Sequence, residues 1–390
     1  MNIQHIILHL SLIQNLTPRL VYEIIETITL EKLSDLYQYN MQDFIKLGCS
    51  QDIAHLIVAG LSDTASLDKE LELVQQHNVT VVTFVCPQYP ALLKQIDVAP
   101  LVLYCQGDVR LFDNEKMFAC VGARKAHSYV RDALVKLVVP MIQDEWVIVS
   151  GGAAGADTYA HQIALDHKGK TIVVVGSGLC HVYPPANRKL FEQVVYDGGL
   201  IVSCFPMNMA SFPYNFPIRN RIISGLSKGC LVLQAASKSG ALITAHFALE
   251  QGREVFAVPG SIFDPLSAGC HDLLQQGAKL VTCTQDILDE LSYPGKVTQV
   301  QMKIQSDTKV KDASSGRDGQ VGKSKSSSIG STADLDDIER SILHYTIVPV
   351  TAEMLMSKVG VSLDILQSKL FSLSLDGKIY QDTIGLWKRV

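Results

Sequence analysis

The sequence predicts an α/β protein built around an extended parallel sheet, with a small helical domain before the sheet and a winged-helix domain after it. Between residues 79 and 291, short β-rich apolar runs alternate with helical segments. Several runs are apolar at nearly every position, which indicates strands buried on both faces. The 390 residues suffice for two or three domains. Alternating strands and helices of this kind predict a Rossmann-like core.

The first segment, residues 1–70, is predicted to be a helical domain similar to SAM or helix-hairpin-helix modules. Thr17 followed by Pro18 is a typical helix start, and Gly48 and Gly60 are expected to end helices. Such a module can contact the DNA backbone through helix ends or dock a partner, and we favour a structural or docking role. Apolar residues recur at helical spacing in three runs, 20–25, 44–47 and 53–58.

The core domain, residues 79–291, is predicted to contain nine strands. Helical segments separate many of them, so the strands are expected to run parallel with helices on both faces of the sheet. The apolar runs are 79–84, 101–104, 118–121, 147–149, 171–175, 200–202, 230–233, 254–258 and 279–281.

The chain after the core divides into a polar stretch and a third domain. Ser, Gly, Lys and Asp dominate residues 296–333, which predicts a flexible linker that acts as a solvated tether. Residues 335–390 are predicted to form a winged helix, with three helices at 335–345, 351–359 and 362–376, followed by a hairpin. The third helix is nearly neutral, so we favour protein contact or a structural role over DNA reading.

Composition limits the classes of function. The net charge is −5 and the pI about 6.1, so nucleic-acid binding would need a local basic patch. Nine scattered cysteines without a C-x-x-C pair indicate neither a zinc site nor a redox motif, and predict buried, reduced thiols in a cytosolic protein. Residues 1–10 lack a basic leader and a cleavage site, so we expect a helix there and no signal peptide. No apolar run reaches about 18 residues, so no membrane insertion is predicted.

Two turns at predicted strand ends have the residues of phosphate-binding loops. Gly122 follows the run 118–121 and allows close backbone approach, and Arg124 and Lys125 add charge where open sheets bind ligands. The turn 150–157, Ser-Gly-Gly-Ala-Ala-Gly-Ala-Asp, is expected to present N–H groups at a helix start. Neither turn is a G-x-G-x-x-G fingerprint or a P-loop, so no nucleotide cofactor is predicted.

Two further segments favour a groove for a phosphate-bearing polymer. Residues 216–221, Phe-Pro-Ile-Arg-Asn-Arg, place an aromatic ring beside two guanidinium groups, which can stack on bases and neutralise phosphates. Residues 239–244, Ser-Gly-Ala-Leu-Ile-Thr, place small residues where a strand should meet a helix.

Candidate catalysts are scarce. Asp157 and His161 lie four residues apart on a predicted helix and can interact on one face, but a helix-capping Asp and a polar core His explain them better. No serine or cysteine has the surroundings of a nucleophile. We therefore predict no catalytic residues and no metal site.

The motifs above, in this order, resemble those of the DprA/Smf family of bacterial DNA-processing proteins. The resemblance covers about residues 85–282, and the flanking segments fit the family's additional helical and winged-helix domains. The motifs that carry it are 89–92, 121–124, 150–157, 183–187, 216–221, 239–244, 258–260 and 277–278.

The resemblance implies a homodimeric, non-enzymatic protein that binds single-stranded DNA, protects incoming DNA during natural transformation and helps to load the RecA recombinase. It implies that Arg124 contacts phosphate, that Phe216 stacks or wedges beside a base and that Asn220 forms a hydrogen bond. It also implies that backbone N–H groups of residues 239–242 bind phosphate. Arg219 and Arg221 would supply charge or hold the groove. The nucleic-acid-binding residues implied are Gly122, Arg124, Lys125, Phe216, Arg219, Asn220, Arg221, Ser239, Gly240, Ala241 and Leu242.

The chain also departs from that family's pattern. Ala123 and Ala154 stand where Ser and a basic residue are frequent, so one phosphate contact is expected to be lost. Cys204 and Gln234 replace residues that are often Glu, which removes negative charge near the same sheet edge. Two alternatives remain open: a nucleotide-processing enzyme like a nucleoside-monophosphate phosphoribohydrolase, and a scaffold whose end modules dock partners.

Overall fold

The computed structural model describes residues 2–292, 337–346 and 350–361, and a few positions beyond these: 366, 369–370, 373, 379–381 and 387–389. The chain divides into two compact units, residues 1–304 and 305–390. The predicted linker, 296–333, lies outside the described residues.

All nine predicted strands are present, in one sheet of order β1-β2-β6-β5-β4-β3-β7-β8-β9. Most of their residues are buried, which explains the nearly continuous apolar runs. The strands are β1 (Thr80–Thr83), β2 (Val102–Gly107), β3 (Met117–Val121), β4 (Val147–Ser150), β5 (Thr171–Val174), β6 (Leu200–Ser203), β7 (Gly229–Val232), β8 (Glu254–Ala257) and β9 (Lys279–Leu280).

The sheet is parallel from β6 to β9, as predicted, but not at its first edge. There β1 pairs antiparallel with β2, and β2 pairs antiparallel with β6, so the prediction of a parallel sheet was wrong for these two strands. A strand buried on both faces has the same apolar composition whichever way its neighbour runs, so its residues do not reveal its direction.

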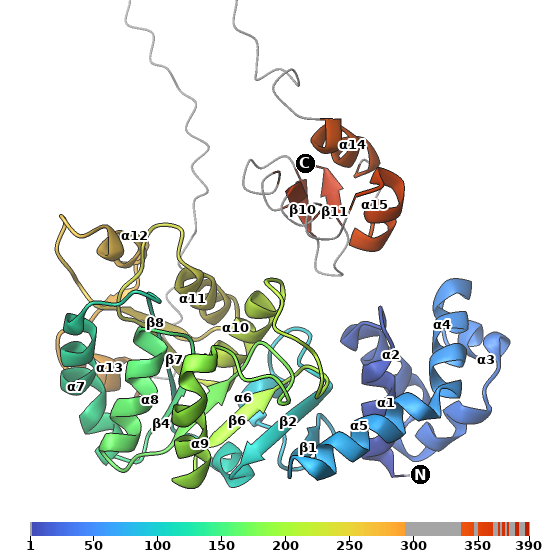
Figure 1. Cartoon of the computed structure of the whole chain (residues 1–390), viewed down its shortest axis with the longest axis horizontal. Coiled ribbons are helices and arrows are strands. Elements are labelled where there is room, and N and C mark those ends of the chain that lie inside the picture. Colours follow the sequence, from blue (N-terminus) through green and yellow to red (C-terminus); the bar gives the residue numbers. More distant parts are fainter. Residues whose placement is uncertain are drawn as a thin grey trace, which may run out of the picture. The chain divides into compact units, whose positions relative to one another are not determined.

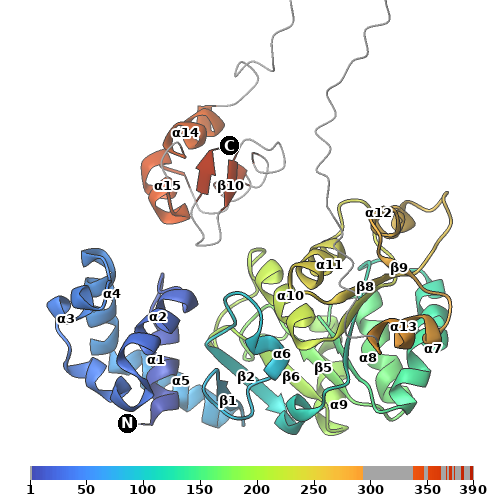
Figure 2. The same cartoon turned by 180° about the vertical axis from the view of Figure 1, so that it is seen from behind.

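Helices cover both faces of the sheet (Figure 1 and Figure 2). The strand residues alternate between the two layers: Phe118 and Cys120 pack toward α7 and α8, and Ala119 and Val121 toward the opposite face. One face is covered by α7 (Ser128–Gln143), α8 (Ala156–Asp166), α9 (Arg188–Tyr196) and α13 (Thr284–Leu291). The other is covered by α6 (Ala91–Lys94), α10 (Asn215–Leu226), α11 (Gly240–Glu250) and α12 (Ala268–Gln275).

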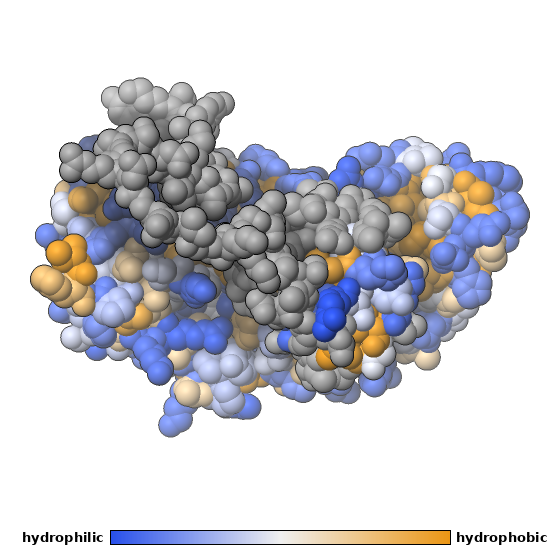
Figure 3. Space-filling view, turned by 90° about the horizontal axis from the view of Figure 1, so that it is seen from above, coloured by the Kyte–Doolittle hydropathy of each residue, from blue (hydrophilic) through white to orange (hydrophobic). Residues whose placement is uncertain are grey.

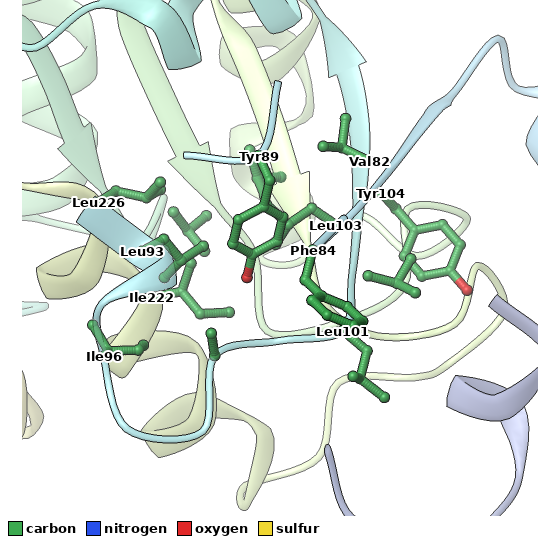
Figure 4. Packing of buried hydrophobic residues seen from close by; sticks show 14 of the residues in the cluster. Val82, Phe84, Tyr89, Leu93, Ile96, Leu101, Leu103, Tyr104, Ile222 and Leu226 are labelled. Carbon is green, nitrogen blue, oxygen red and sulfur yellow. The ribbon is translucent and has the colours of Figure 1, made fainter. Parts of the chain in front are cut away.

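The N-terminal helices share one hydrophobic core with the antiparallel edge of the sheet. The Tyr22 ring packs edge-on against Phe84 with centroids 4.6 Å apart, and Figure 4 shows Phe84 among the buried side chains of that edge. Glu70 Oε1 accepts a hydrogen bond from Met207 N at 2.7 Å. The predicted boundary near residue 70 thus lies inside one compact unit. The elements are α1 (Ile3–Leu12), α2 (Pro18–Ile28), the 3₁₀ helix η1 (Leu30–Gln38), α3 (Met41–Lys46), α4 (Gln51–Ser62) and α5 (Thr64–Gln76).

The helix ends in this region follow local signals, with one exception. Thr17 caps α2 and Pro18 is its first residue, as predicted. Gly48 lies just after α3 with φ +93°, a conformation that glycine adopts without strain. Gly60 does not end a helix but lies within α4. A Cβ there would stand 2.6 Å from the Ile13 side chain, so this glycine serves close helix packing.

Where the structure describes the second unit, it has the helices α14 (Asp337–Tyr345) and α15 (Ala352–Val359). Strands β10 (Ile379–Gln381) and β11 (Trp387–Arg389) form an antiparallel pair. Most of the predicted third helix lies outside the described residues, so the winged helix stays a prediction.

All nine cysteines carry free thiols, and six are buried, although Cys283 is exposed. None of the helices in the described residues is both long and apolar enough to span a bilayer.

Candidate nucleic-acid interface

A cleft of about 420 Å³ opens at the carboxyl ends of the parallel strands. Four chain segments form most of it: the turn after β3, the turn after β4, the first turns of α10 and the start of α11. The structure brings nine of the eleven predicted residues together in its lining: Gly122, Arg124, Lys125, Phe216, Arg219, Asn220, Ser239, Gly240 and Ala241.

The turn after β3 supplies the accessible charge of the cleft. The side chains of Arg124 and Lys125 are exposed. Gly122 lines the cleft and also has a packing role that was not predicted. A Cβ there would stand 2.7 Å from the Ala156 Cβ and 3.2 Å from the Gln234 carbonyl oxygen. Glycine is therefore required for the close packing of α8 against β3 and β7.

The turn after β4 uses its N–H groups within the protein. The Asp157 carboxylate accepts hydrogen bonds from the N–H groups of Gly151 and Ala153, both at 3.2 Å. The N–H of Ala156 donates to the Ala123 carbonyl at 3.1 Å. These three N–H groups, in the turn that was predicted to present N–H groups to an anion, already have protein acceptors. Asp157 thus organises the turn. The prediction that it caps a helix was wrong, because Gly155 is the N-cap of α8 and no side chain caps it.

Arg219 is a buried residue that links two strand ends through hydrogen bonds. Its Nη1 donates to the carbonyl oxygens of Gly151, after β4, and Val174, at the end of β5. Burial lowers the pKa of Arg219 to about 10, although the nearby Asp157 carboxylate opposes the shift, so the side chain is charged at neutral pH. Burial also raises the pKa of Asp157, against the effect of Arg219. Of the two predicted roles for Arg219, the geometry favours holding the groove.

Phe216 stands between two guanidinium groups and a second ring. The Cζ atoms of Arg124 and Arg219 lie 5.4 and 5.6 Å from its ring centroid, within cation–π range. The Tyr183 ring lies 5.7 Å away, and a Cβ on Gly176 would come within 3.0 Å of the Phe216 ring. A smaller cavity of about 70 Å³ shares Phe216 and Arg124 with the cleft, so the two spaces meet at this ring.

The start of α11 forms the opposite wall. Ser239 Oγ caps the helix by accepting from the Ala241 N–H at 3.3 Å. Asn220 connects this wall to Arg219: its Oδ1 accepts from Arg219 Nε at 3.0 Å, and its Nδ2 donates to the Gly240 carbonyl at 3.2 Å. Gly240 is exposed, and a Cβ there would meet nothing within 4 Å.

Arg221 and Leu242 do not line the cleft, in contrast to their predicted place beside the other nine. On an α-helix each residue is rotated by about 100° from the last, so Arg221 points away from the face of Asn220. Its charge acts on the phenols of Tyr22 and Tyr89, on the side of the N-terminal helices. Leu242 instead lies near Gly269, at α12.

Sequence reasoning also missed part of the lining. Ala153 and Thr244 lie in motifs that were recognised without being assigned to the site. Leu266, which precedes α12, had no signal because it reaches the cleft only through the tertiary fold. Ala154 and Tyr183 line the smaller cavity.

His161 has a structural role. It is fully buried on α8, and its Nδ1 lies 2.7 Å from Thr171 Oγ1. Burial lowers the pKa of His161 to about 3, so it is neutral at physiological pH. The prediction of a polar core histidine is confirmed.

Comparison with known proteins agrees with the resemblance found in the sequence. A family model, DNA recombination-mediator protein A, matches residues 80–292. DNA processing protein DprA of Streptococcus pneumoniae is 45% identical over 205 residues, which are 53% of this chain and 72% of the relative. DprA of Bacillus subtilis is 40% identical over 225 residues, 58% of this chain and 75% of the relative. The X-ray structure of S. pneumoniae DprA superposes with a TM-score of 0.65 and 36% identity, covering 74% of this chain and 99% of that one. The chain therefore belongs to the DNA recombination-mediator protein A family, which includes the DprA and Smf proteins.

Proposed function

We propose that this protein binds single-stranded DNA, without sequence preference, along the cleft at the carboxyl ends of the strands. The observation that carries the proposal is the pairing of exposed Arg124 and Lys125 with the ring of Phe216 at one cleft. Cations neutralise backbone phosphates, and an aromatic ring stacks on any base, so this combination binds strands of any sequence.

The shape of the cleft favours a single strand. The cleft and the smaller cavity share Phe216 in their linings, so a strand that runs from one to the other passes this ring. A base can reach the ring only when it is unpaired and unstacked, as in single-stranded nucleic acid.

The cleft supports binding better than catalysis. In the described part of the chain, the one carboxylate of its lining is Asp157, which is buried and bonded to two backbone N–H groups. A phosphoribohydrolase needs an acidic group free to act on its substrate. We therefore propose a non-enzymatic role, and release of base from AMP would contradict it.

Membership of the family supports wider roles. We propose that the protein acts as a homodimer that protects incoming DNA and loads RecA onto it. Sedimentation of the full chain tests the dimer. RecA filament formation on DNA coated with a single-strand-binding protein tests the loading.

Anisotropy of a labelled oligo-dT at two salt concentrations tests the central proposal. Arg124→Ala is expected to weaken binding and to lower the slope of log K against log salt by about one, because one phosphate contact is lost. Arg110→Ala is the matched control. The Arg110 side chain is 84% exposed. Arg110 follows β2, and the last residue of β2 pairs with the first residue of β6, so Arg110 lies at the sheet edge opposite the cleft.

Two results would refute the proposal. One is tight binding to duplex DNA alone. The other is equal affinity of the wild type and Arg124→Ala for oligo-dT at both salt concentrations.

A further inference from the structure

The turn between β8 and α12 exposes two large apolar side chains. Phe263 is 89% exposed, the highest value for a large hydrophobic residue in the described part of the chain, and its neighbour Ile262 is 81% exposed. In Figure 1 the chain between β8 and α12 projects from the body of the unit. The two neighbouring side chains together form a small exposed apolar surface that a ligand can contact.

Hydrogen bonds hold this rim turn (residues 261–264) in one shape. Ser261 accepts bonds at its Oγ from the Phe263 N–H at 3.2 Å, and at its carbonyl from the Asp264 N–H at 3.1 Å. Asp264 Oδ1 accepts from the Leu266 N–H at 2.9 Å. Before the turn, the Tyr129 hydroxyl donates to the Pro259 carbonyl at 2.7 Å. The backbone is thus fixed while the two apolar side chains point outward.

Gln234 connects the rim turn to the cleft wall. This side chain is only 2% exposed. Its Oε1 accepts from the His127 N–H at 3.1 Å, just after the turn that carries Arg124 and Lys125, and its Nε2 donates to Asp264 Oδ2 at 2.8 Å. A glutamate could not donate to Asp264, so the amide is required for this bridge.

The rim turn is also continuous with the cleft itself. Leu266, three residues beyond Phe263, lines the cleft. A strand leaving the cleft along the wall of Lys125 therefore passes the exposed ring. We propose that Phe263 stacks on a nucleobase of the bound strand just outside the cleft, with Ile262 packed against the same base. This inference rests on the proposed binding of single-stranded DNA.

The small size of the apolar surface favours a base over a protein. A stable protein interface buries about 800 Å² on each partner. The apolar surface of the rim turn comes from two side chains, flanked by the exposed Ser261 and by Asp264. Hydrophobic residues on the face in Figure 3 likewise form separate small groups among hydrophilic ones. One ring matches one base, and such stacking is tolerant of sequence.

The test measures binding of labelled oligo-dT of increasing length to full-length Phe263→Ala, Phe263→Leu and Phe263→Trp. Alanine and leucine are expected to weaken binding of long oligonucleotides about tenfold, the effect of losing one stacked base, while short ones that fill only the cleft are unaffected. Tryptophan is expected to keep the affinity, and oligo-dT should quench its added fluorescence. Tyr196→Ala is the matched control, because Tyr196 is 86% exposed and ends α9, away from the cleft.

The outcomes separate this inference from the function on which it rests. If the wild type binds and Arg124→Ala does not, but Phe263→Ala matches the wild type at every length, the stacking role is overturned alone. The same holds if Phe263→Leu keeps full affinity, or if Phe263→Ala changes only the oligomeric mass in sedimentation, which would make the turn a protein contact. Absence of any wild-type binding would overturn both proposals.

Discussion

Replacing the buried Arg219 by methionine tests whether this arginine stabilises the cleft, in contrast to the exposed Arg124. Arg219 is 4% exposed and donates to the carbonyl oxygens of Gly151 and Val174 and to Asn220 Oδ1. In Arg219→Met these three acceptors lose a charged donor, and the buried carboxylate of Asp157 loses the positive charge that favours its ionised form.

The expected cost follows from these contacts. Removing one member of a buried charged group costs about 3–5 kcal/mol, and a hydrogen bond to a charged partner about 1.5–3 kcal/mol. The two estimates describe overlapping interactions, so we expect a total loss of about 3–5 kcal/mol. For a unit of this size, that lowers the melting temperature by about 6–20 °C.

Trp146 makes this loss measurable. It is 6% exposed and packs edge-on against Phe118, and the only other tryptophan, Trp387, belongs to the second unit. In a Trp387→Phe background, urea and thermal unfolding followed by Trp146 emission report on the first unit.

The exposed Arg124 provides the control. Arg124→Met is expected to unfold within about 0.5 kcal/mol of the parent while losing DNA affinity. If Arg219→Met also unfolds within about 1 kcal/mol of the parent, the buried guanidinium does not hold the cleft together, and the reasoning fails.

Three further predictions concern stability. Between pH 6.5 and 5 the unfolded state protonates His161 while the folded state, with a pKa of about 3, does not, so stability falls as pH falls. The wild type should lose about 1.5 kcal/mol more than His161→Gln in urea titrations, and equal losses would contradict this. Gly155→Ala should lower the free energy of unfolding by about 2 kcal/mol, because φ of Gly155 is +81° and the added Cβ would overlap the Ala123 carbonyl oxygen. An unchanged melting temperature would argue against this. Gln234→Glu places a second carboxylate beside Asp264 and should destabilise by about 1–2 kcal/mol at pH 7 and less at pH 5, as calorimetry can show.

The strands were predictable because burial constrains them one by one. A four-residue strand such as β4 or β5 is buried at every position, so each position must be apolar or small. Helix starts such as Thr17 were predictable because the cap bonds to a backbone N–H only three residues away. The antiparallel edge and the continuation of α4 through Gly60 were not, because each depends on a segment distant in the sequence.

The candidate site was predictable in its residue types but not in their roles. Arg124, Arg219 and Arg221 are chemically alike, yet one is exposed, one is buried beneath the cleft and one faces the N-terminal helices. The exposed ring of Phe263 lies outside every motif recognised in the sequence. Its position beside the cleft depends on Gln234, 29 positions earlier in the chain.

The sequence by itself determined the succession of strands and helices along the chain, the turns at the strand ends and the family. These depend on neighbouring residues and on motifs of set spacing. Only the tertiary structure decided which groups are free to meet a ligand. The Asp157 carboxylate accepts hydrogen bonds from N–H groups that the turn after β4 was expected to present to a ligand. The Arg219 guanidinium donates hydrogen bonds to carbonyl oxygens at two strand ends. A polar group is available only if no other part of the folded chain satisfies it, and those partners are brought together by packing.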